Sequence, residues 1–473
     1  MLTGIKSLVR KTVSLLGTKT QPQYPIVVPR DKHTLSRKNI SPNALKVLYR
    51  LQEAGYESYL VGGCIRDHLI GIEPKDFDVV TNATPEEVHD IFANSRLIGR
   101  RFKLVHVTYG REIIEVSTFR ANQADSAPTA PKSLKDKDTA RSAHGIILRD
   151  NVYGTIDEDA IRRDFTFNAL YYNVKDFAIH DYCGGLKDIE QRQIRIIGDP
   201  RARYQEDPVR MLRAIRFAAK LNFEIEEQTK APIKEMAHLL DHIPPARLFE
   251  EVLKLLSSGN GVRTFTLLRE FGLFKYLFPD ADALLDREWK QGQFSAERFI
   301  LRGLENTDER IQSGKSTAPY FLYAFMLWPS VLLRQSEFEQ QGMPTTPALH
   351  HAATMVLDNQ IASTSIPRRF STPMREIWDL QLRLPKRHGK RPFILLSHPR
   401  FRAAFDFLLI REESGEALDG LGSWWESFQH APENQQRQLI DKVTASKEPG
   451  DAKKRRRPRH RRKSNTVRRQ QED

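Results

Sequence analysis

Residues 59–81 read YLVGGCIRDHLIGIEPKDFDVVT, and this stretch decides the fold of the first part of the chain. Tyr59–Val61 is an apolar run that favours a β-strand, and it stops at Gly62 and Gly63. Adjacent glycines let the backbone take positive φ values and let a bulky group approach the main chain. Cys64–Leu69 then predicts a short helix whose first free N–H groups suit a phosphate. The stretch therefore predicts a strand, a glycine turn, a short helix, a loop and a second strand.

Two aspartates stand at the expected second strand. Residues two apart in a strand share a face, so we expect Asp76 and Asp78 side by side, with Phe77 turned into the core. Two carboxylates this close repel unless a cation lies between them, and Mg²⁺ takes carboxylate and phosphate oxygens. Arg66 adds a guanidinium whose fork suits phosphate. A lone Gly-Gly is usually a turn and a lone Asp-x-Asp a solvated strand end, but together they predict a metal–triphosphate site.

A hairpin is expected next, because residues 104–109 and 112–119 alternate around Gly110. Glu115 is a carboxylate in an otherwise apolar strand. It is a candidate third metal ligand if this strand neighbours the aspartates, and an edge-strand charge explains it equally well. Arg120, at the end of the strand, can reach a phosphate. Residues 121–145 are small, polar and charged, which predicts a mobile loop.

Two further motifs carry charged groups on expected helices. In IRRDFTFNAL (161–170), a helix would let the two arginines and Asp164 act together on a nucleotide, although a charged helix start is the simpler interpretation. In EDPVRMLRAIRF (206–217), Arg210, Arg213 and Arg216 share one helix stripe. An acid and an arginine on such a helix can read a base edge, but the stripe can equally be an ordinary basic face.

These motifs resemble a known family. GGCIRD (62–67) followed by DFD (76–78) resembles the head of the class II nucleotidyltransferases, which include bacterial poly(A) polymerases and CCA-adding enzymes. RRDFTFN (162–168) resembles the RRDFT-N block of the family, and EDPVRMLRA (206–214) resembles its base-selecting helix. Between these motifs, PKDFDVVTNATPEEV (74–88) and GRRFKLVHV (99–107) favour the poly(A) polymerase branch. The resemblance implies Mg²⁺-dependent, template-independent addition of AMP from ATP to RNA 3′ ends.

The resemblance also implies a set of site residues. The implied catalytic residues are Asp76, Asp78 and Asp164. Asp76 and Asp78 are the metal ligands, and the third is either Asp164 or the strand candidate Glu115, which the resemblance does not supply. The implied nucleotide-binding residues are Gly62, Gly63, Arg66, Asp67, Arg120, Arg162, Arg163, Asp207, Arg210 and Arg213, with Asp207 and Arg210 selecting the base. Two alternatives stay open. One is a CCA-adding tRNA nucleotidyltransferase, and the other is a non-catalytic RNA-binding adaptor, which the intact aspartates oppose.

Composition sets wider limits. At 473 residues the chain can hold two or three domains, and a net charge of +14 favours a polyanionic partner, either nucleic acid or an anionic membrane. The two cysteines, Cys64 and Cys183, exclude a disulfide framework and favour a reducing, cytoplasmic setting. No run approaches the roughly 18 apolar residues of a membrane-spanning helix, so there is no firm membrane signal. RNA-decay proteins are further candidate partners of such an enzyme.

We expect an α+β protein with a small mixed-sheet nucleotidyltransferase head, an all-helical neck and body, and a disordered basic tail. Basic and aromatic residues interleave at 386–402, which suits a single-stranded RNA path, although a solvated basic loop explains them equally well. Residues 447–473 hold twelve Lys/Arg and four acids, a net +8. Such a block cannot fold alone and should bind RNA in a salt-sensitive way, with a protein or membrane contact as the alternative. The expected parts are a flexible arm (1–40), the head (41–198), an RNA- and nucleotide-binding neck (199–260), an RNA-binding body (261–445) and the tail (446–473).

Overall fold

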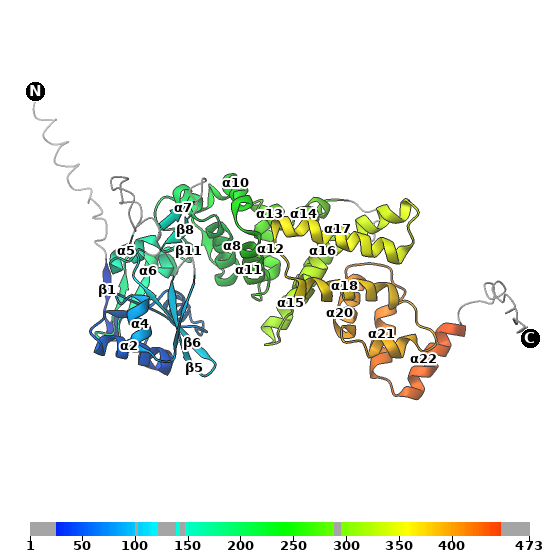
Figure 1. Cartoon of the computed structure of the whole chain (residues 1–473), viewed down its shortest axis with the longest axis horizontal. Coiled ribbons are helices and arrows are strands. Elements are labelled where there is room, and N and C mark those ends of the chain that lie inside the picture. The colour runs from blue at the N-terminus through cyan, green and yellow to red at the C-terminus, as the bar shows by residue number, and fades with distance from the viewer. Residues whose placement is uncertain are drawn as a thin grey trace, which may run out of the picture.

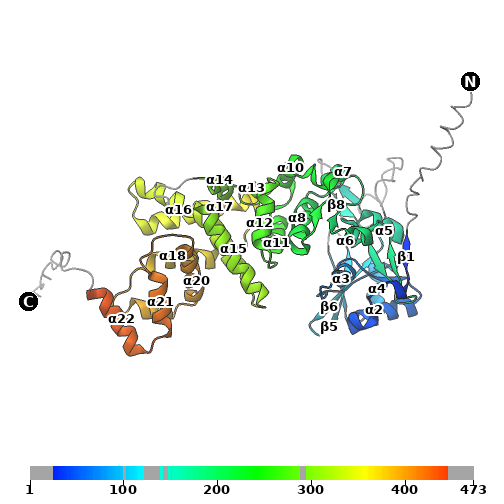
Figure 2. The same ribbon diagram turned by 180° about the vertical axis from the view of Figure 1, so that it is seen from behind.

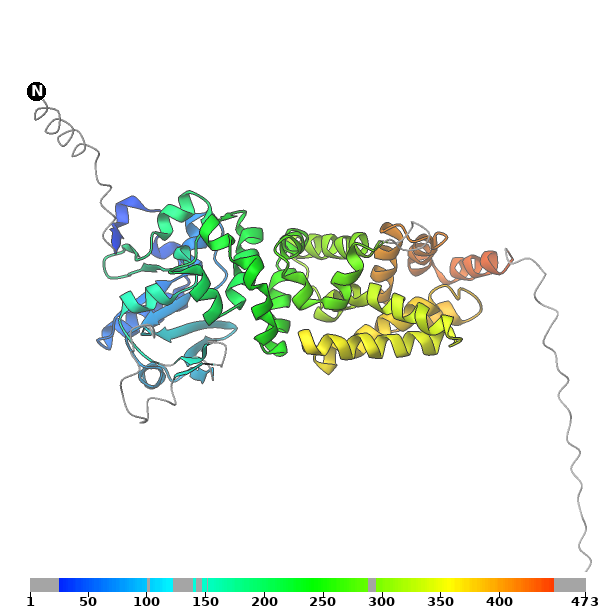
Figure 3. The same ribbon diagram turned by 90° about the horizontal axis from the view of Figure 1, so that it is seen from above.

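The computed structural model describes residues 25–99, 103–121, 139–141, 147–150, 152–287 and 295–445. The molecule is elongated, with all strands of its large sheet at one end and helices along the rest (Figure 1). The view from behind and the view from above show the same division (Figures 2 and 3). The α+β architecture expected from the sequence, a mixed-sheet head followed by helices, is confirmed.

An eight-stranded mixed sheet forms the head, in the order β1-β10-β9-β2-β3-β6-β5-β4. Within this sheet β3 and β6 run parallel, and the other neighbouring pairs are antiparallel. The expected hairpin is confirmed as β5 and β6, with Gly110 at a φ of 63° in the turn. The strands of the sheet are β1 (Ile26–Val28), β2 (Ser58–Val61), β3 (Asp78–Thr81), β4 (Ser95–Ile98), β5 (Leu104–Tyr109), β6 (Glu112–Thr118), β9 (Leu170–Tyr172) and β10 (Ile179–Asp181).

Short helices connect and cover the strands, and their ends follow capping rules. Pro42 opens α2 behind Ser41, whose side chain accepts from the amide of Asn43. Thr84 and Glu87 cap each other at the start of α4, as the sequence predicts. The helices of the head are α2 (Pro42–Glu53), α3 (Gly63–Leu69), α4 (Pro85–Ile91), α5 (Ile156–Arg162) and α6 (Gly185–Glu190), with the 3₁₀ turns η1 (Arg30–Lys32), η2 (Arg37–Asn39) and η5 (Thr166–Asn168).

The two faces of the sheet differ in chemistry. One face carries a buried apolar layer beneath α2 and α4, which includes Val79 of β3 and Val116 of β6. Because successive strand residues alternate, Asp78 and Glu115 belong to the opposite face. Val61, Val80 and Tyr171 form a second, smaller core on that face. The sheet thus presents its carboxylates away from its main core.

The expected N-terminal arm needs correction. Residues 25–40 belong to the head, because β1 pairs with β10 and because Leu35 and Ile40 are buried in the main head core. Burial of these two side chains outweighs the polar, proline-containing composition of the segment. Residues 1–24 lie outside the described part of the chain.

Other expected segments fall partly or wholly outside the described residues. Within 121–145, the structure describes β7 (Thr139–Arg141), which pairs with β8 (Ile147–Asp150). The rest of that expected loop after residue 121, and the whole basic tail at 446–473, lie outside the described residues.

Helices dominate the described residues after 199, where the two-residue strand β12 (Glu224–Ile225) pairs with β11 (Gln193–Ile194). Among the described residues, no helix is both long and apolar enough to cross a membrane. The helices are α7 (Pro200–Glu206), α8 (Val209–Leu221), α9 (Glu227–Lys230), α10 (Ile233–Met236), η6 (Ala237–His242), α11 (Pro245–Leu256), α12 (Gly261–Glu270), α13 (Phe274–Leu277), α14 (Pro279–Leu285), α15 (Ala296–Gln312), α16 (Pro319–Gln340), α17 (Thr345–Ser363), α18 (Arg368–Arg383), α19 (Arg391–Leu396), α20 (Phe401–Glu413), α21 (Leu421–His430) and α22 (Glu433–Ala445).

The helical region has two cores. The larger one is continuous from α8 to α20, so the boundary expected at residue 260 does not coincide with a break in packing. It also takes in Phe165 and Phe167, which fixes the head to the neck. A smaller core around Trp425 joins the last helices, and Trp425 is fully buried, so its role is packing.

Candidate active site

Two carboxylates lie side by side across β3 and β6. The parallel register places Asp78 opposite Glu115, so the proximity expected for Glu115 is confirmed. Asp76, in contrast, does not lie in the strand, because β3 begins at Asp78. Asp78 pairs with Val61, the last residue of β2, so the pairing of β3 with β2 ends there and Asp76 lies before the strand.

The carboxylates repel one another. Asp78 has exposed surface at the start of its strand, but many protein atoms surround its carboxylate. This partial removal from water, together with the charge of Glu115, raises the pKa of Asp78 to about 6. Asp76 acts in the same direction, and the cation of Arg163 opposes them. A hard cation with oxygen preference would relieve this repulsion, so the donor set fits Mg²⁺. Among the described residues, no three acidic, His or Cys side chains already form a closed metal site.

A histidine completes the row across the sheet. His106 of β5 lies opposite Glu115, and its Nε2 is 3.6 Å from Glu115 Oε2. The sequence reasoning missed His106, although the alternation of β5 and β6 around Gly110 was a signal that could have found it. Glu115 therefore lies between a carboxylate on one side and an imidazole on the other.

The glycine turn lies directly beside Asp78. Gly62 follows Val61, the strand partner of Asp78, and has a φ of 75°, where other residues are strained. Its amide donates to the carbonyl of Leu170 at 3.1 Å. A side chain at Gly62 would stand 3.7 Å from Arg163 Nη1. The turn therefore keeps open a space that is bordered by a carboxylate and a guanidinium.

Arg163 is held by a buried pair that the sequence reasoning did not assign to the site. Its Nη2 donates to Asp159 at 2.9 Å, and its Nε donates to the Tyr171 hydroxyl at 2.9 Å. Tyr171 in turn donates to Asp159 at 2.8 Å. Burial disfavours the charge, but Tyr171 and Asp159 more than compensate and raise the pKa of Arg163. Arg163 is therefore a fixed cation next to Asp78.

Further arginines concentrate positive charge between the head and the neck. Burial and the neighbouring cations, Arg120 first among them, lower the pKa of Arg162 to about 9. Burial and Arg210 lower the pKa of Arg203 to about 10. Burial is also the main cause of a lowered pKa at Arg120. Crowded guanidinium groups of this kind are stabilised by an anion.

Arg66 departs from the expectation that it contacts phosphate. It is buried, its Nε and Nη2 donate to Asp67 Oδ1, and its Nη1 donates to Asn168 at 2.7 Å. The other oxygen of Asp67 accepts from Lys220 of α8 at 3.2 Å. Arg66 and Asp67 therefore brace the head against the neck, with the buried Arg66 side chain facing Phe217 rather than solvent.

Asp164 also departs from its expected place. Its Oδ2 accepts from Nε of Arg213 at 2.6 Å, and its Oδ1 accepts from the Phe165 amide and from Asn168 at 2.8 and 2.9 Å. Burial opposes the charge, but Arg213 and these donors hold the pKa of Asp164 well below its usual range. The expected helix over 161–170 is wrong, because α5 ends at Arg162, Arg163 is extended backbone, and the 3₁₀ turn η5 begins only at Thr166.

The residues expected to read the base are paired within the neck. Asp207 Oδ2 accepts from Arg247 at 2.7 Å. Arg210 donates to Glu206 at 3.0 Å and to the carbonyl of Arg203 at 2.8 Å. The expected helix is confirmed as α8 from Val209 onward, with Arg210 and Arg213 on one stripe and a buried apolar face opposite. The expectation that Asp207 lies on this helix is wrong, because Asp207 is extended backbone after the end of α7. Arg247 was not identified from the sequence, because it lies 40 residues from Asp207.

Comparison with known protein families covers most of the chain. Residues 58–195 match the poly A polymerase head domain. Residues 222–285 match the probable RNA and SrmB-binding site of polymerase A, and residues 341–463 match the polymerase A arginine-rich C-terminus.

Individual relatives agree with these matches. Poly(A) polymerase I of Salmonella typhi is 46% identical over 477 residues, which cover 99% of this chain and 100% of that protein. A CCA-adding enzyme of Geobacillus is 36% identical over 311 residues, covering 64% of this chain and 71% of the relative. Among solved structures, the Thermotoga maritima CCA-adding enzyme complexed with tRNA has a TM-score of 0.51 at 20% identity, covering 90% of this chain and all of that one, which shows a shared fold.

Proposed function

The chain belongs to the bacterial poly(A) polymerase family, and from this membership we propose that it transfers AMP from ATP to RNA 3′ ends without a template. One observation carries the proposal: Asp78 and Glu115 lie side by side across β3 and β6, next to the open turn at Gly62 and the fixed cation of Arg163. This arrangement combines a cation site with a place for a triphosphate. The adenylyl group would transfer as the RNA 3′ oxygen attacks the α-phosphorus and pyrophosphate leaves.

Asp78, Glu115 and Asp76 would hold Mg²⁺. When bound, the ion would lower the pKa of the RNA 3′ hydroxyl and stabilise charge on the α-phosphate. Glu115 is a better candidate for the third carboxylate than Asp164, because both oxygens of Asp164 are already engaged by Arg213, Asn168 and the Phe165 amide. We therefore assign Asp164 the role of bracing the head against Arg213 of the neck.

The triphosphate would bind the glycine turn and the arginines around it. Gly62 and Gly63 lack side chains that would block the main chain, and Arg163 offers a guanidinium held by Asp159 and Tyr171. Arg162 and Arg120 add charge from the same region, and an anion would offset the repulsion that lowers the pKa of Arg162. In-line attack needs this fixed placement of the substrate.

Base selection would fall to Asp207 and Arg210. An aspartate accepts from the exocyclic amino group of adenine, and an arginine donates to ring acceptors. Arg247 and Glu206 fix these two side chains before the nucleotide arrives. A preset pair of this kind costs less conformational entropy on binding than two free side chains.

A primer-extension experiment tests this function. An unstructured RNA and a tRNA lacking its CCA end each receive Mg²⁺ with ATP, CTP or both. Long extension of both RNAs with ATP alone supports poly(A) addition, whereas CTP-dependent addition that stops at CCA on the tRNA identifies a CCA-adding enzyme. The double substitution Asp76→Ala and Asp78→Ala should abolish incorporation. If the wild type binds RNA normally but incorporates no nucleotide, the protein is a non-catalytic RNA-binding adaptor instead.

We also propose a cellular compartment and binding partners for this enzyme. Both cysteines are free thiols, which fits a reducing cytoplasm. RNA 3′ ends and ATP are the proposed substrates, and RNA-decay proteins are proposed partners, testable by co-purification of the tagged chain with and without ribonuclease treatment.

A further inference from the structure

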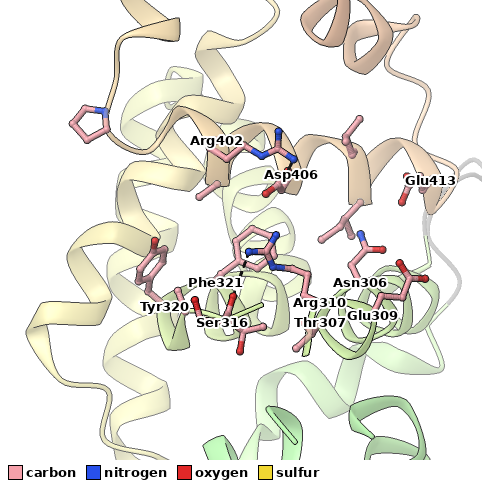
Figure 4. Close-up of a pocket in the computed structure, with 16 residues that line it drawn as sticks. Asn306, Thr307, Glu309, Arg310, Ser316, Tyr320, Phe321, Arg402, Asp406 and Glu413 are labelled. Atoms are coloured by element: carbon pink, nitrogen blue, oxygen red, sulfur yellow. Dashed lines mark hydrogen bonds and ion pairs between the residues drawn. The ribbon is translucent and has the colours of Figure 1, made fainter. Parts of the chain in front are cut away.

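A cavity of about 470 Å³ opens between α15, α16 and α20, in the helical body. Its volume falls within the range of small-ligand sites, roughly 300–1,000 Å³. In the close-up, Arg402 and Asp406 of α20 face Arg310 and Phe321 across the hollow (Figure 4). The proposed reaction in the head involves none of these residues. The cavity is therefore a separate candidate binding site.

One wall of the cavity is aromatic. Phe321 packs edge-on against Phe325 and Phe407, with ring centroids 6.0 and 6.2 Å apart, so the core holds its ring in place. Tyr320, next to it, lies beneath the guanidinium of Arg400 at 5.2 Å. Flat side chains fixed from behind are suited to stacking against an RNA base.

The other walls carry charged groups. Arg402 pairs with Asp406 at 2.9 Å, and its side chain is 66% exposed. Arg310 is exposed and donates to the Ser316 carbonyl at 3.3 Å. Burial raises the pKa of Asp406 although Arg402 and Arg310 oppose it. Arginines of this kind contact phosphates, and a carboxylate accepts from an exocyclic amino group.

The cavity lies at the end of the basic and aromatic segment 386–402, which suits an RNA path. Pro399 and Arg402 line it. Phe401 is buried in the core and is not available to stack, so Tyr320 and Phe321 replace it as the candidate platform. Glu309 and Glu413 also line the cavity and would repel a run of phosphates. These charges fit one nucleotide better than a continuous strand.

We propose that this cavity binds one unpaired nucleotide of the RNA substrate, upstream of the 3′ end, with its base against Tyr320 and Phe321. Its flanking phosphates lie toward Arg402 and Arg310, and Asp406 accepts from the amino group of adenine or cytosine. Uracil has no such group and binds more weakly. The inference rests on the proposed function in taking RNA as the substrate.

The test measures binding of the full chain, without ATP, to long oligo(A) and oligo(U) by fluorescence anisotropy. Tyr320→Ala should weaken oligo(A) binding by about 5- to 100-fold, the range of one base stack, and Tyr320→Phe should restore it. Arg402→Ala should weaken the binding of both oligo(A) and oligo(U). The matched control is Arg437→Ala, because Arg437 also pairs with an acid four residues away and is 70% exposed, but does not line the cavity. Asp406→Asn should reduce the preference for oligo(A).

The outcomes separate this inference from the proposed function. Thermal melts first establish that each variant is folded. Wild-type affinity in both Tyr320→Ala and Arg402→Ala would overturn the inference, as would an equal loss in Arg437→Ala, which would indicate a diffuse charge effect. AMP addition to a primer too short to reach the body reports only on the head and neck. Its absence in the wild type would refute the proposed function without affecting the binding result.

Discussion

Two acidic residues in the head, Glu115 and Asp164, differ in their surroundings and should differ in their roles. Glu115 has Asp78 as its strand partner and a half-exposed carboxylate, whereas Asp164 is 12% exposed and bound to Arg213. A metal ligand needs a carboxylate oxygen that an ion can reach. A residue that braces two parts of the fold needs its oxygens already bonded to other residues. These surroundings support the proposal that Glu115 binds the metal and that Asp164 braces the head against Arg213.

The first prediction concerns Glu115→Gln. Replacing one metal-binding carboxylate by an amide should lower kcat by about 10- to 100-fold and raise the Mg²⁺ concentration needed for half-maximal rate. Thermal stability should not fall, because the substitution also removes the repulsion with Asp78. Primer extension across a Mg²⁺ titration checks both effects. An unchanged Mg²⁺ requirement would remove Glu115 from the metal site.

The second prediction concerns Asp164→Asn. The amide cannot keep the charge-assisted bonds from Arg213 and leaves that guanidinium uncompensated, so unfolding should become easier by about 2–4 kcal/mol. The Mg²⁺ requirement of the remaining folded enzyme should not change. Calorimetry and the same Mg²⁺ titration measure the two quantities. A raised Mg²⁺ requirement with unchanged stability would reverse the two assignments.

The third prediction concerns Arg247→Met. Without Arg247, the Asp207 carboxylate loses the donor that fixes its orientation. Discrimination of ATP against UTP, whose base has no exocyclic amino group, should fall by about 5- to 10-fold, since one well-oriented pair of hydrogen bonds discriminates on that scale. Arg269→Met is the control, because Arg269 bridges Asp286 and Glu297 away from Asp207. Equal loss in both variants would mean that helix stability, not base reading, is affected.

Among the elements, the turn between β2 and α3 offers the fourth prediction. Gly62→Ala and Gly71→Ala both place a side chain at positive φ, of 75° and 79°, so each should cost about 1–2 kcal/mol of stability. Only the Gly62 methyl group would enter the space near Arg163, whereas no atom lies within 4 Å of a Cβ at Gly71. KM for ATP should therefore rise only in Gly62→Ala. A similar rise in both variants would show that backbone strain alone weakens ATP binding.

Elements with local signals were predictable from the sequence. The caps of α2 and α4, the β5–β6 hairpin and the arginine stripe of α8 all follow from residues within a few positions of one another. The predictions were wrong where contacts between residues far apart in the sequence determine the backbone or the burial of a side chain. The chain leaves helical geometry after Arg162, and Asp164 there meets Arg213, 49 residues away. Arg66 is buried and donates to Asn168, 102 residues away. No pattern of neighbouring residues in the sequence indicates this contact.

At the scale of the whole molecule, positive charge is unevenly distributed along the chain. Residues 447–473 hold a net +8 of the total of +14, so the other 446 residues together carry only +6. The proposed nucleotide cavity in the body has acidic as well as basic lining, which suits local recognition rather than long-range attraction. General attraction to RNA should therefore come mainly from the C-terminal residues, and recognition of single nucleotides from the head, neck and body.

The fifth prediction tests this division by removing residues 447–473. Each cation that meets a phosphate of single-stranded RNA releases a fraction of a counterion, so the slope of log Kd against log salt should become shallower by several units, at most about 8. Affinity at low salt should fall, while kcat on a short primer at saturating concentration should not, because the head and neck are intact. A variant with the same C-terminal residues in scrambled order is the control. If charge alone acts, the scrambled variant binds RNA like the wild type across the salt titration. If it binds like the truncated variant, the order of the C-terminal residues matters, and they contact a defined surface of RNA or protein rather than attracting phosphate in general.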